Sequence, residues 1–264
     1  MLGRDHLSIS IATIIPFLIP LFFINFVDVS YVIPILISII IGSLLPDSDC
    51  KGKATIAYKF PAIDTFMRNF VGKPLVYVLN YLIGEKKIKV EHEVKDEHRG
   101  IIHSPLGILI STTILTLLVL IFSLLFGVFN LYVILSIFFG LAIGQLLHIL
   151  EDSCTITGIN WFFPFSTKEL NGKIYTFSKD PEKKDIRPML YSGILYAFSI
   201  LLVIGFAFNK IQINIWLLYS LILLIVFLIW IFIRFLSKKE ENGWLVKKDI
   251  INNFNKGVKR LEKT

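Results

Sequence analysis

The chain of 264 residues alternates between long apolar runs and shorter polar connections. Apolar runs that could cross the ~30 Å hydrocarbon layer of a bilayer occur six times, and none carries Asp, Glu, Lys or Arg in its central part. The pattern therefore predicts an all-α integral membrane protein. Its six expected transmembrane helices cover about residues 7–27, 30–46, 105–129, 131–151, 189–209 and 213–236, the second being the shortest.

The polar connections predict smaller elements outside the membrane-spanning helices. Residues 56–83 are rich in aromatic and aliphatic side chains and are broken by Pro61 and Pro74, which favours interfacial helices lying on the bilayer. Residues 169–175 contain the Asn-Gly pair typical of a two-residue turn, so a small β-hairpin is expected there.

The chain divides into a polytopic domain, residues 1–236, and a basic tail, residues 237–264. Apolar positions in the tail recur at spacings of three and four, which predicts an amphipathic helix on the anionic lipids of the inner leaflet. The last two apolar helices carry no ionisable residue suited to chemistry and are expected to serve packing alone.

Composition and charge place the chain in the membrane and predict its orientation. Hydrophobic residues make up 55% of the sequence, mean hydropathy is +0.70 and the net charge is +7. All Lys and Arg except Lys210 fall on the side that holds both termini, so the positive-inside rule predicts cytoplasmic N- and C-termini in a cell (inner or plasma) membrane. Topology accounts for this basic charge, and no nucleic-acid partner is expected.

Ionisable residues gather at the expected cytoplasmic ends of the first four helices. His6 precedes the first, and Asp47 and Asp49 follow the second in a Leu-Pro-Asp-Ser-Asp segment. His98 and His103 precede the third in His-Arg-Gly-Ile-Ile-His-Ser, where Ser104 can cap the helix and Pro105 suits its first turn. Each of these patterns alone has an ordinary explanation as a polar helix end.

The fourth helix carries a stripe of functional residues. Gly140, Gly144, His148 and Asp152 recur every four positions, which places successive members on one slowly drifting face. The glycines permit close approach of another helix, and His148 and Asp152 then lie one turn apart at the cytoplasmic end. A buried, hydrogen-bonded histidine beside an unrelated carboxylate is the alternative explanation.

Together these seven residues predict a metal site, with His6, Asp47, Asp49, His98, His103, His148 and Asp152 as candidate ligands. Imidazole and carboxylate donors favour Zn²⁺, with Mn²⁺ or Fe²⁺ as alternatives, and seven donors suit two or three ions. Asp49 could instead be a general base or orient a ligand histidine, and Arg99 is a candidate contact for an anionic substrate. His92, in a strongly charged run, is expected to be solvated.

These motifs resemble a family of membrane-bound metal-dependent hydrolases named after a LexA-binding inner-membrane member. The resemblance covers roughly residues 1–165, and the His98-Arg-Gly…His103-Ser motif is its most specific part. The family is thought to be distantly similar to zinc-dependent phospholipase C and P1 nuclease, which implies a helical phosphoesterase. Those soluble enzymes use a further histidine-rich helix, which the last two helices of this chain do not supply.

The expected function is hydrolysis, by metal-activated water, of a phospholipid-like or other amphiphilic substrate at the cytoplasmic leaflet. Two alternatives remain open. A divalent-metal transporter would need polar groups near the membrane midplane, and a non-enzymatic scaffold would use a structural metal to tie helix ends together.

Overall fold

The structure is a computed structural model that describes residues 1–24, 29–49, 55–74, 77, 101–163, 165–166, 168–175, 185–208 and 214–238. Throughout these residues the regular structure is helical. Long helices are α1 (Gly3–Ile24), α2 (Val29–Gly42), α6 (Pro105–Leu125), α7 (Leu131–Asp152), α8 (Arg187–Ala207) and α9 (Ile215–Ser237). Short helical segments are η1 (Leu45–Asp49), α3 (Thr55–Lys59), α4 (Pro61–Phe66), the π-helical η2 (Met67–Gly72) and η3 (Ile101–His103).

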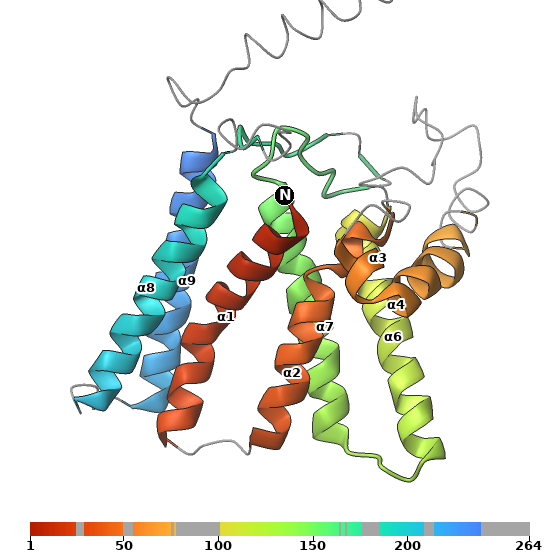
Figure 1. Ribbon diagram of the computed structural model, residues 1–264, viewed down its shortest axis with the longest axis horizontal. Coiled ribbons are helices and arrows are strands. Elements are labelled where there is room, and N and C mark those ends of the chain that lie inside the picture. The colour runs from red at the N-terminus through yellow and green to blue at the C-terminus, as the bar shows by residue number, and fades with distance from the viewer. Residues whose placement is uncertain are drawn as a thin grey trace, which may run out of the picture.

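The long helices form an antiparallel bundle (Figure 1), in which α2 packs along α7 and α1 along α8. Five of them, α1, α6, α7, α8 and α9, are long and apolar enough to span a bilayer, which supports a multi-pass membrane protein. The predicted count of six spans is not confirmed, because α2 has only 14 residues. Its apolar run continues to Leu45, but the helix already ends at Gly42, and the chain turns into η1 around Pro46.

Gly140 and Gly144, the glycines of the four-residue stripe on α7, form the contact with α2, as their spacing predicts. A Cβ atom added at Gly144 would lie 2.4 Å from the Ile39 carbonyl oxygen and 2.8 Å from the Ser43 amide nitrogen. At Gly140 the same atom would lie 2.8 Å from the Ile35 carbonyl oxygen. These two positions therefore need glycine, since the backbones of α2 and α7 lie too close for any side chain.

The short segments between α2 and α6 pack on the same end of the bundle. Leu44 and Leu45 from the turn after α2 form a buried cluster with Ile56 of α3 and with Met67 and Val71 of η2. This apolar base holds η1 in place. In Figure 1, α3 and α4 lie beside the upper end of α6, at an angle to the long helices.

The β-hairpin predicted at residues 169–175 is not confirmed. The described part of this segment forms two isolated bridges with the chain after α7, Thr155 with Ile174 and Ile159 with Leu170. Gly172 lies against the backbone of Cys154, where a Cβ atom would be 2.1 Å from the carbonyl oxygen. Pairing with a distant segment has thus replaced the local turn that the Asn-Gly pair favours.

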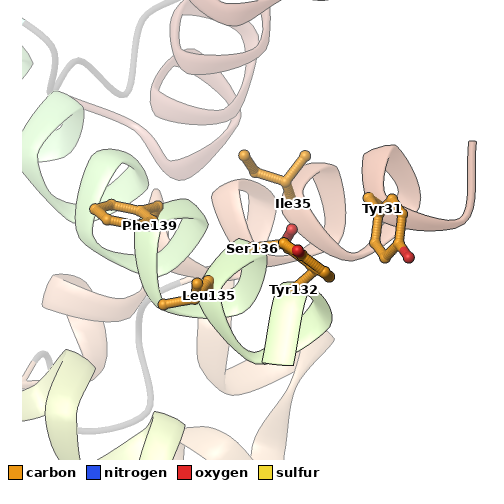
Figure 2. A pocket seen from close by; sticks show the side chains of 6 residues that line it. All are labelled: Tyr31, Ile35, Tyr132, Leu135, Ser136 and Phe139. Carbon is orange, nitrogen blue, oxygen red and sulfur yellow. The ribbon is translucent and has the colours of Figure 1, made fainter. Parts of the chain in front are cut away.

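A groove of about 340 Å³ lies between α2 and α7 (Figure 2). It is lined by Tyr31, Ile35, Tyr132, Leu135, Ser136 and Phe139. Tyr31 and Tyr132 meet edge to face at its end, with ring centroids 5.8 Å apart. The groove lies near the start of α7, whereas the stripe delivers His148 near its end, so the two features are separate.

The glycine contact predicts a specific loss of stability. Gly144→Ala should lower the free energy of unfolding by ~1–3 kcal/mol, because the added methyl group collides with backbone atoms that cannot rotate away. Thermal unfolding in detergent micelles measures the change.

Gly193→Ala on α8 is the matched control. A Cβ atom there meets nothing within 4 Å, and alanine favours a helix by up to ~1 kcal/mol, so its stability should be unchanged or higher. Equal melting temperatures for Gly144→Ala and the wild type would contradict the close contact.

Candidate metal centre

The start of α6 fixes His103 in a buried position. Ser104 caps the helix, since its hydroxyl oxygen accepts from the Gly107 amide at 3.1 Å and donates to the Ile101 carbonyl at 2.7 Å. Pro105 is the first helical residue, as expected. His103 is the last residue of η3 and is fully buried, so a rigid cap holds its imidazole.

Asp47 and His6 come from two other helix ends. Asp47 lies in η1, where the buried Leu45 anchors the turn after α2, and its side chain is 9% exposed. The prediction that His6 precedes the first helix is wrong. Helix α1 already begins at Gly3, and His6 is a fully buried residue of this helix. The helix starts early because the Leu2 carbonyl accepts from the amides of Asp5 and His6.

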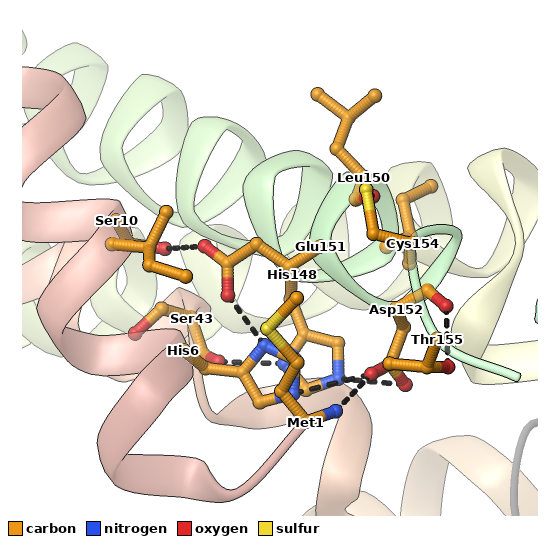
Figure 3. Close-up of polar contacts among 12 residues, drawn as sticks. Met1, His6, Ser10, Ser43, His148, Leu150, Glu151, Asp152, Cys154 and Thr155 are labelled. Carbon is orange, nitrogen blue, oxygen red and sulfur yellow. Dashed lines mark hydrogen bonds and ion pairs between the residues drawn. The ribbon is translucent and has the colours of Figure 1, made fainter. Parts of the chain in front are cut away.

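Five of the predicted ligands meet at this end of the bundle. The His148 Nε2 atom lies 3.6 Å from Asp47 Oδ1 and 3.9 Å from Asp152 Oδ2. His103 Nε2 lies 3.8 Å from the same Asp47 oxygen, and His6 Nε2 lies 3.3 Å from Asp152 Oδ1. The rings of His6 and His148 stack with centroids 3.8 Å apart, which Figure 3 shows from close by.

Hydrogen bonds orient two of the three imidazoles. His148 Nδ1 lies 2.7 Å from the Ser43 carbonyl oxygen, to which it must donate, and His6 Nδ1 lies 2.6 Å from Glu151 Oε2. The Nε2 atoms of both rings are buried and make no hydrogen bond to any described residue. Histidines that bind metals have this arrangement, in which one nitrogen donates to the protein and the other faces the ion.

Electrostatics favour an ionised Asp47. Burial alone would raise the pKa of this carboxyl group, but the neighbouring imidazoles of His148, His103 and His6 outweigh burial and lower the pKa below its usual range. An anionic oxygen therefore lies among nitrogen donors, which is the charge distribution that attracts a cation.

The donors form two overlapping triads, His6–His148–Asp152 and Asp47–His103–His148, with the ligand atoms of each within 4.8 Å of one another. Both triads use His148. Its Nδ1 is committed to Ser43, and a single neutral nitrogen binds a single ion. The described residues thus fit one divalent ion with nitrogen and oxygen donors, of which Zn²⁺ is the best match.

Comparison with known families agrees with a membrane location. The family model described as the YdjM inner membrane protein matches residues 1–240. The chain belongs to the YdjM inner membrane protein family. No curated protein and no solved structure matches the chain. Membership of the YdjM family and the five candidate spans together support a multi-pass inner-membrane protein, and the reaction is left to be inferred from the site.

The described residues of this YdjM family member include five of the seven predicted ligands in the cluster. His98 and Arg99 lie outside the described residues, and Asp49 ends η1 with a side chain that is likewise outside them. The predictions of two or three ions, of a base role for Asp49 and of substrate contact by Arg99 therefore stay predictions.

Four contacts at the cluster were not predicted from the sequence. Glu151 and the Ser43 carbonyl oxygen contact the imidazoles of His6 and His148, and the Ser10 hydroxyl donates to Glu151. The amino group of Met1 contacts Asp152 Oδ1 (Figure 3). A spacing of four residues does not include Glu151, because this residue lies three positions after His148. A backbone carbonyl carries no sequence signal. The spacing of His6 and Ser10, one turn apart on α1, was the available clue.

The shared His148 predicts the metal stoichiometry. Purified protein loaded with Zn²⁺ should retain about one ion per chain, and His148→Ala should retain almost none, because both triads lose their common donor. Mass spectrometry of metal content after gel filtration in detergent measures both.

His92→Ala removes a histidine predicted to be solvated and should keep the full stoichiometry. Two ions per wild-type chain would favour the larger cluster over the single site, and full retention of Zn²⁺ by His148→Ala would reject the site.

Proposed function

We propose that the protein is a membrane-embedded, metal-dependent hydrolase that acts on an amphiphilic phosphate ester at the cytoplasmic leaflet. The observation that carries the proposal is the buried set of three imidazoles and two carboxylates. Two of the imidazoles, those of His6 and His148, make their hydrogen bonds through Nδ1, which leaves Nε2 for an ion. The family resemblance of these motifs points to the same chemistry.

The residues of the cluster would hold one divalent ion through His148 together with either Asp47 and His103 or His6 and Asp152. When bound, such an ion supplies Lewis acidity, which polarises a phosphoryl oxygen and lowers the pKa of water toward ~7. Asp47 is the most exposed of the five and lies at the edge of the cluster, so it is the carboxylate best placed to meet a substrate. His148 and His6 are fully buried, so bulk water does not reach their stacked rings.

The surroundings of the cluster support an amphiphilic substrate. The segments α3 and η2, which pack against η1, expose Tyr58, Lys59 and Phe70, and Lys73, directly after η2, is exposed as well. Aromatic and basic side chains together suit the headgroup region of a bilayer. A substrate with an acyl chain and a phosphate could approach Asp47 along this surface.

A structural metal site is the second candidate, favoured by one observation. All five donor residues are buried, and structural zinc sites are closed whereas catalytic ones keep an open position. Under this alternative the ion ties the ends of α1, α2, α6 and α7 together without turnover. A transporter is less favoured, since the sequence places no ionisable residue in the central part of any span.

Hydrolysis is tested with the Zn²⁺-loaded protein in mixed vesicles of zwitterionic and anionic phospholipids and with a chromogenic phosphodiester. Release of phosphate or headgroup should stop on chelation and return with Zn²⁺. Asp47→Asn should lower kcat at least ~100-fold, because a ligand should matter at least as much as an outer-shell partner. Phosphorus NMR and absorbance follow the products.

Asp64→Asn in α4 is the matched control. This carboxyl group is also buried, burial raises its pKa, and it lies outside the metal cluster, so an amide should replace it without loss of turnover. A folded, Zn²⁺-loaded protein that releases nothing from any of these substrates would favour the structural site. Under that outcome Asp47→Asn would lower only the melting temperature.

A further inference from the structure

Glu151 is a fully buried carboxylate whose two oxygen atoms are each paired with a residue of α1. Oε2 lies 2.6 Å from His6 Nδ1, and Oε1 accepts a hydrogen bond from the Ser10 hydroxyl at 3.0 Å (Figure 3). A buried carboxylate is costly unless such bonds satisfy it. These contacts therefore explain how α7 tolerates a second acidic side chain directly beside Asp152.

The pairing determines which nitrogen of His6 carries a proton. When Glu151 is ionised its oxygens only accept hydrogen bonds, so Nδ1 donates, and a neutral His6 ring then has its lone pair on Nε2. That atom is buried, makes no hydrogen bond to a described residue and lies 3.3 Å from Asp152 Oδ1. Glu151 thus holds the lone pair of His6 toward the candidate metal position.

The pairing also fixes the rotation of the imidazole. The His6 ring stacks on His148, with centroids 3.8 Å apart and an interplanar angle of 15°. A half-turn about the Cβ–Cγ bond would put Cδ2 where Nδ1 lies and Cε1 where Nε2 lies, which would take Nε2 away from Asp152. The short contact to Glu151 opposes that rotation, just as the Ser43 carbonyl does for His148.

We propose that Glu151 is a positioning residue of the metal centre, which orients His6 and sets its tautomer for binding a divalent cation. The proposal rests on the proposed function in that it requires the cluster to bind metal. It assigns a role to a side chain that touches neither the ion nor a substrate but acts through His6.

The test uses the full chain in detergent and measures Zn²⁺ affinity by competition with a chromogenic chelator, together with the melting temperature of the metal-free protein. Glu151→Gln keeps the size and one acceptor oxygen but removes the charge. It should weaken Zn²⁺ binding ~10- to 100-fold, which is the usual effect of losing the group that hydrogen-bonds to a metal-binding histidine. The metal-free melting temperature should change no more than in Ser10→Ala.

Ser10→Ala is the matched control, since it removes the other hydrogen bond to the same carboxylate and leaves the contact with His6 in place. Its Zn²⁺ affinity should stay within about threefold of the wild type, as for a substitution away from the ligands. A double-mutant cycle tests whether Glu151 changes Zn²⁺ affinity through His6. In a His6→Ala background, Glu151→Gln should cause no further loss of affinity.

Three results would overturn the role of Glu151: unchanged Zn²⁺ affinity in Glu151→Gln, an equal loss with and without His6, or an equal loss in Ser10→Ala. If Glu151→Gln does not fold, Glu151→Asp draws the carboxylate back by one methylene group and should show the same loss. A wild-type protein that binds no Zn²⁺ would reject the proposed function itself, whereas wild-type binding with an unaffected Glu151→Gln rejects only the positioning role.

Discussion

The backbone contact between α2 and α7 is the constraint on which the metal cluster depends. Helices with ordinary side chains between them lie 8–10 Å apart, but Gly140 and Gly144 remove the side chains from this crossing. Ser43 can then reach His148 with its carbonyl oxygen, and η1 places Asp47 beside the same ring. The packing of two apolar helices thus determines the geometry of a polar site one turn further along.

The remaining helices secure what this contact creates. Tyr191 and Leu195 of α8 pack with Ile9 of α1, which carries His6. Arg187 at the start of α8 pairs with Asp185 and donates to the Lys173 carbonyl oxygen, and Arg234 of α9 donates to the carbonyl oxygen of Ser153. The chain that follows Asp152 is therefore held by arginines from both helices. The prediction that α8 and α9 serve packing alone is therefore incomplete. Arginines at their ends also hold the chain that follows Asp152 in place.

Local sequence signals predicted much of the arrangement. Apolar runs located the long helices, Ser104 and Pro105 marked the start of α6, and the four-residue stripe on α7 marked its contact face. Signals that depend on distant partners were missed. Glu151 was not singled out from the sequence, because its partner His6 lies 145 positions away. The Asn-Gly pair at residues 171–172 does not form the predicted hairpin, because its segment pairs with residues 155–159.

Helix lengths also bear on the bilayer around the protein. With 14 residues α2 is ~21 Å long, whereas α7 with 22 residues is ~33 Å long, so α2 falls short of the ~30 Å hydrocarbon layer. Lipids beside too short a span respond by local thinning, at a modest cost for each Å of mismatch. If α2 crosses the bilayer, headgroup phosphates next to it would lie nearer the midplane than those next to α6 or α9. Asp47 lies in η1, shortly after this helix ends, so under the proposed function such thinning would bring phosphates closer to the cluster.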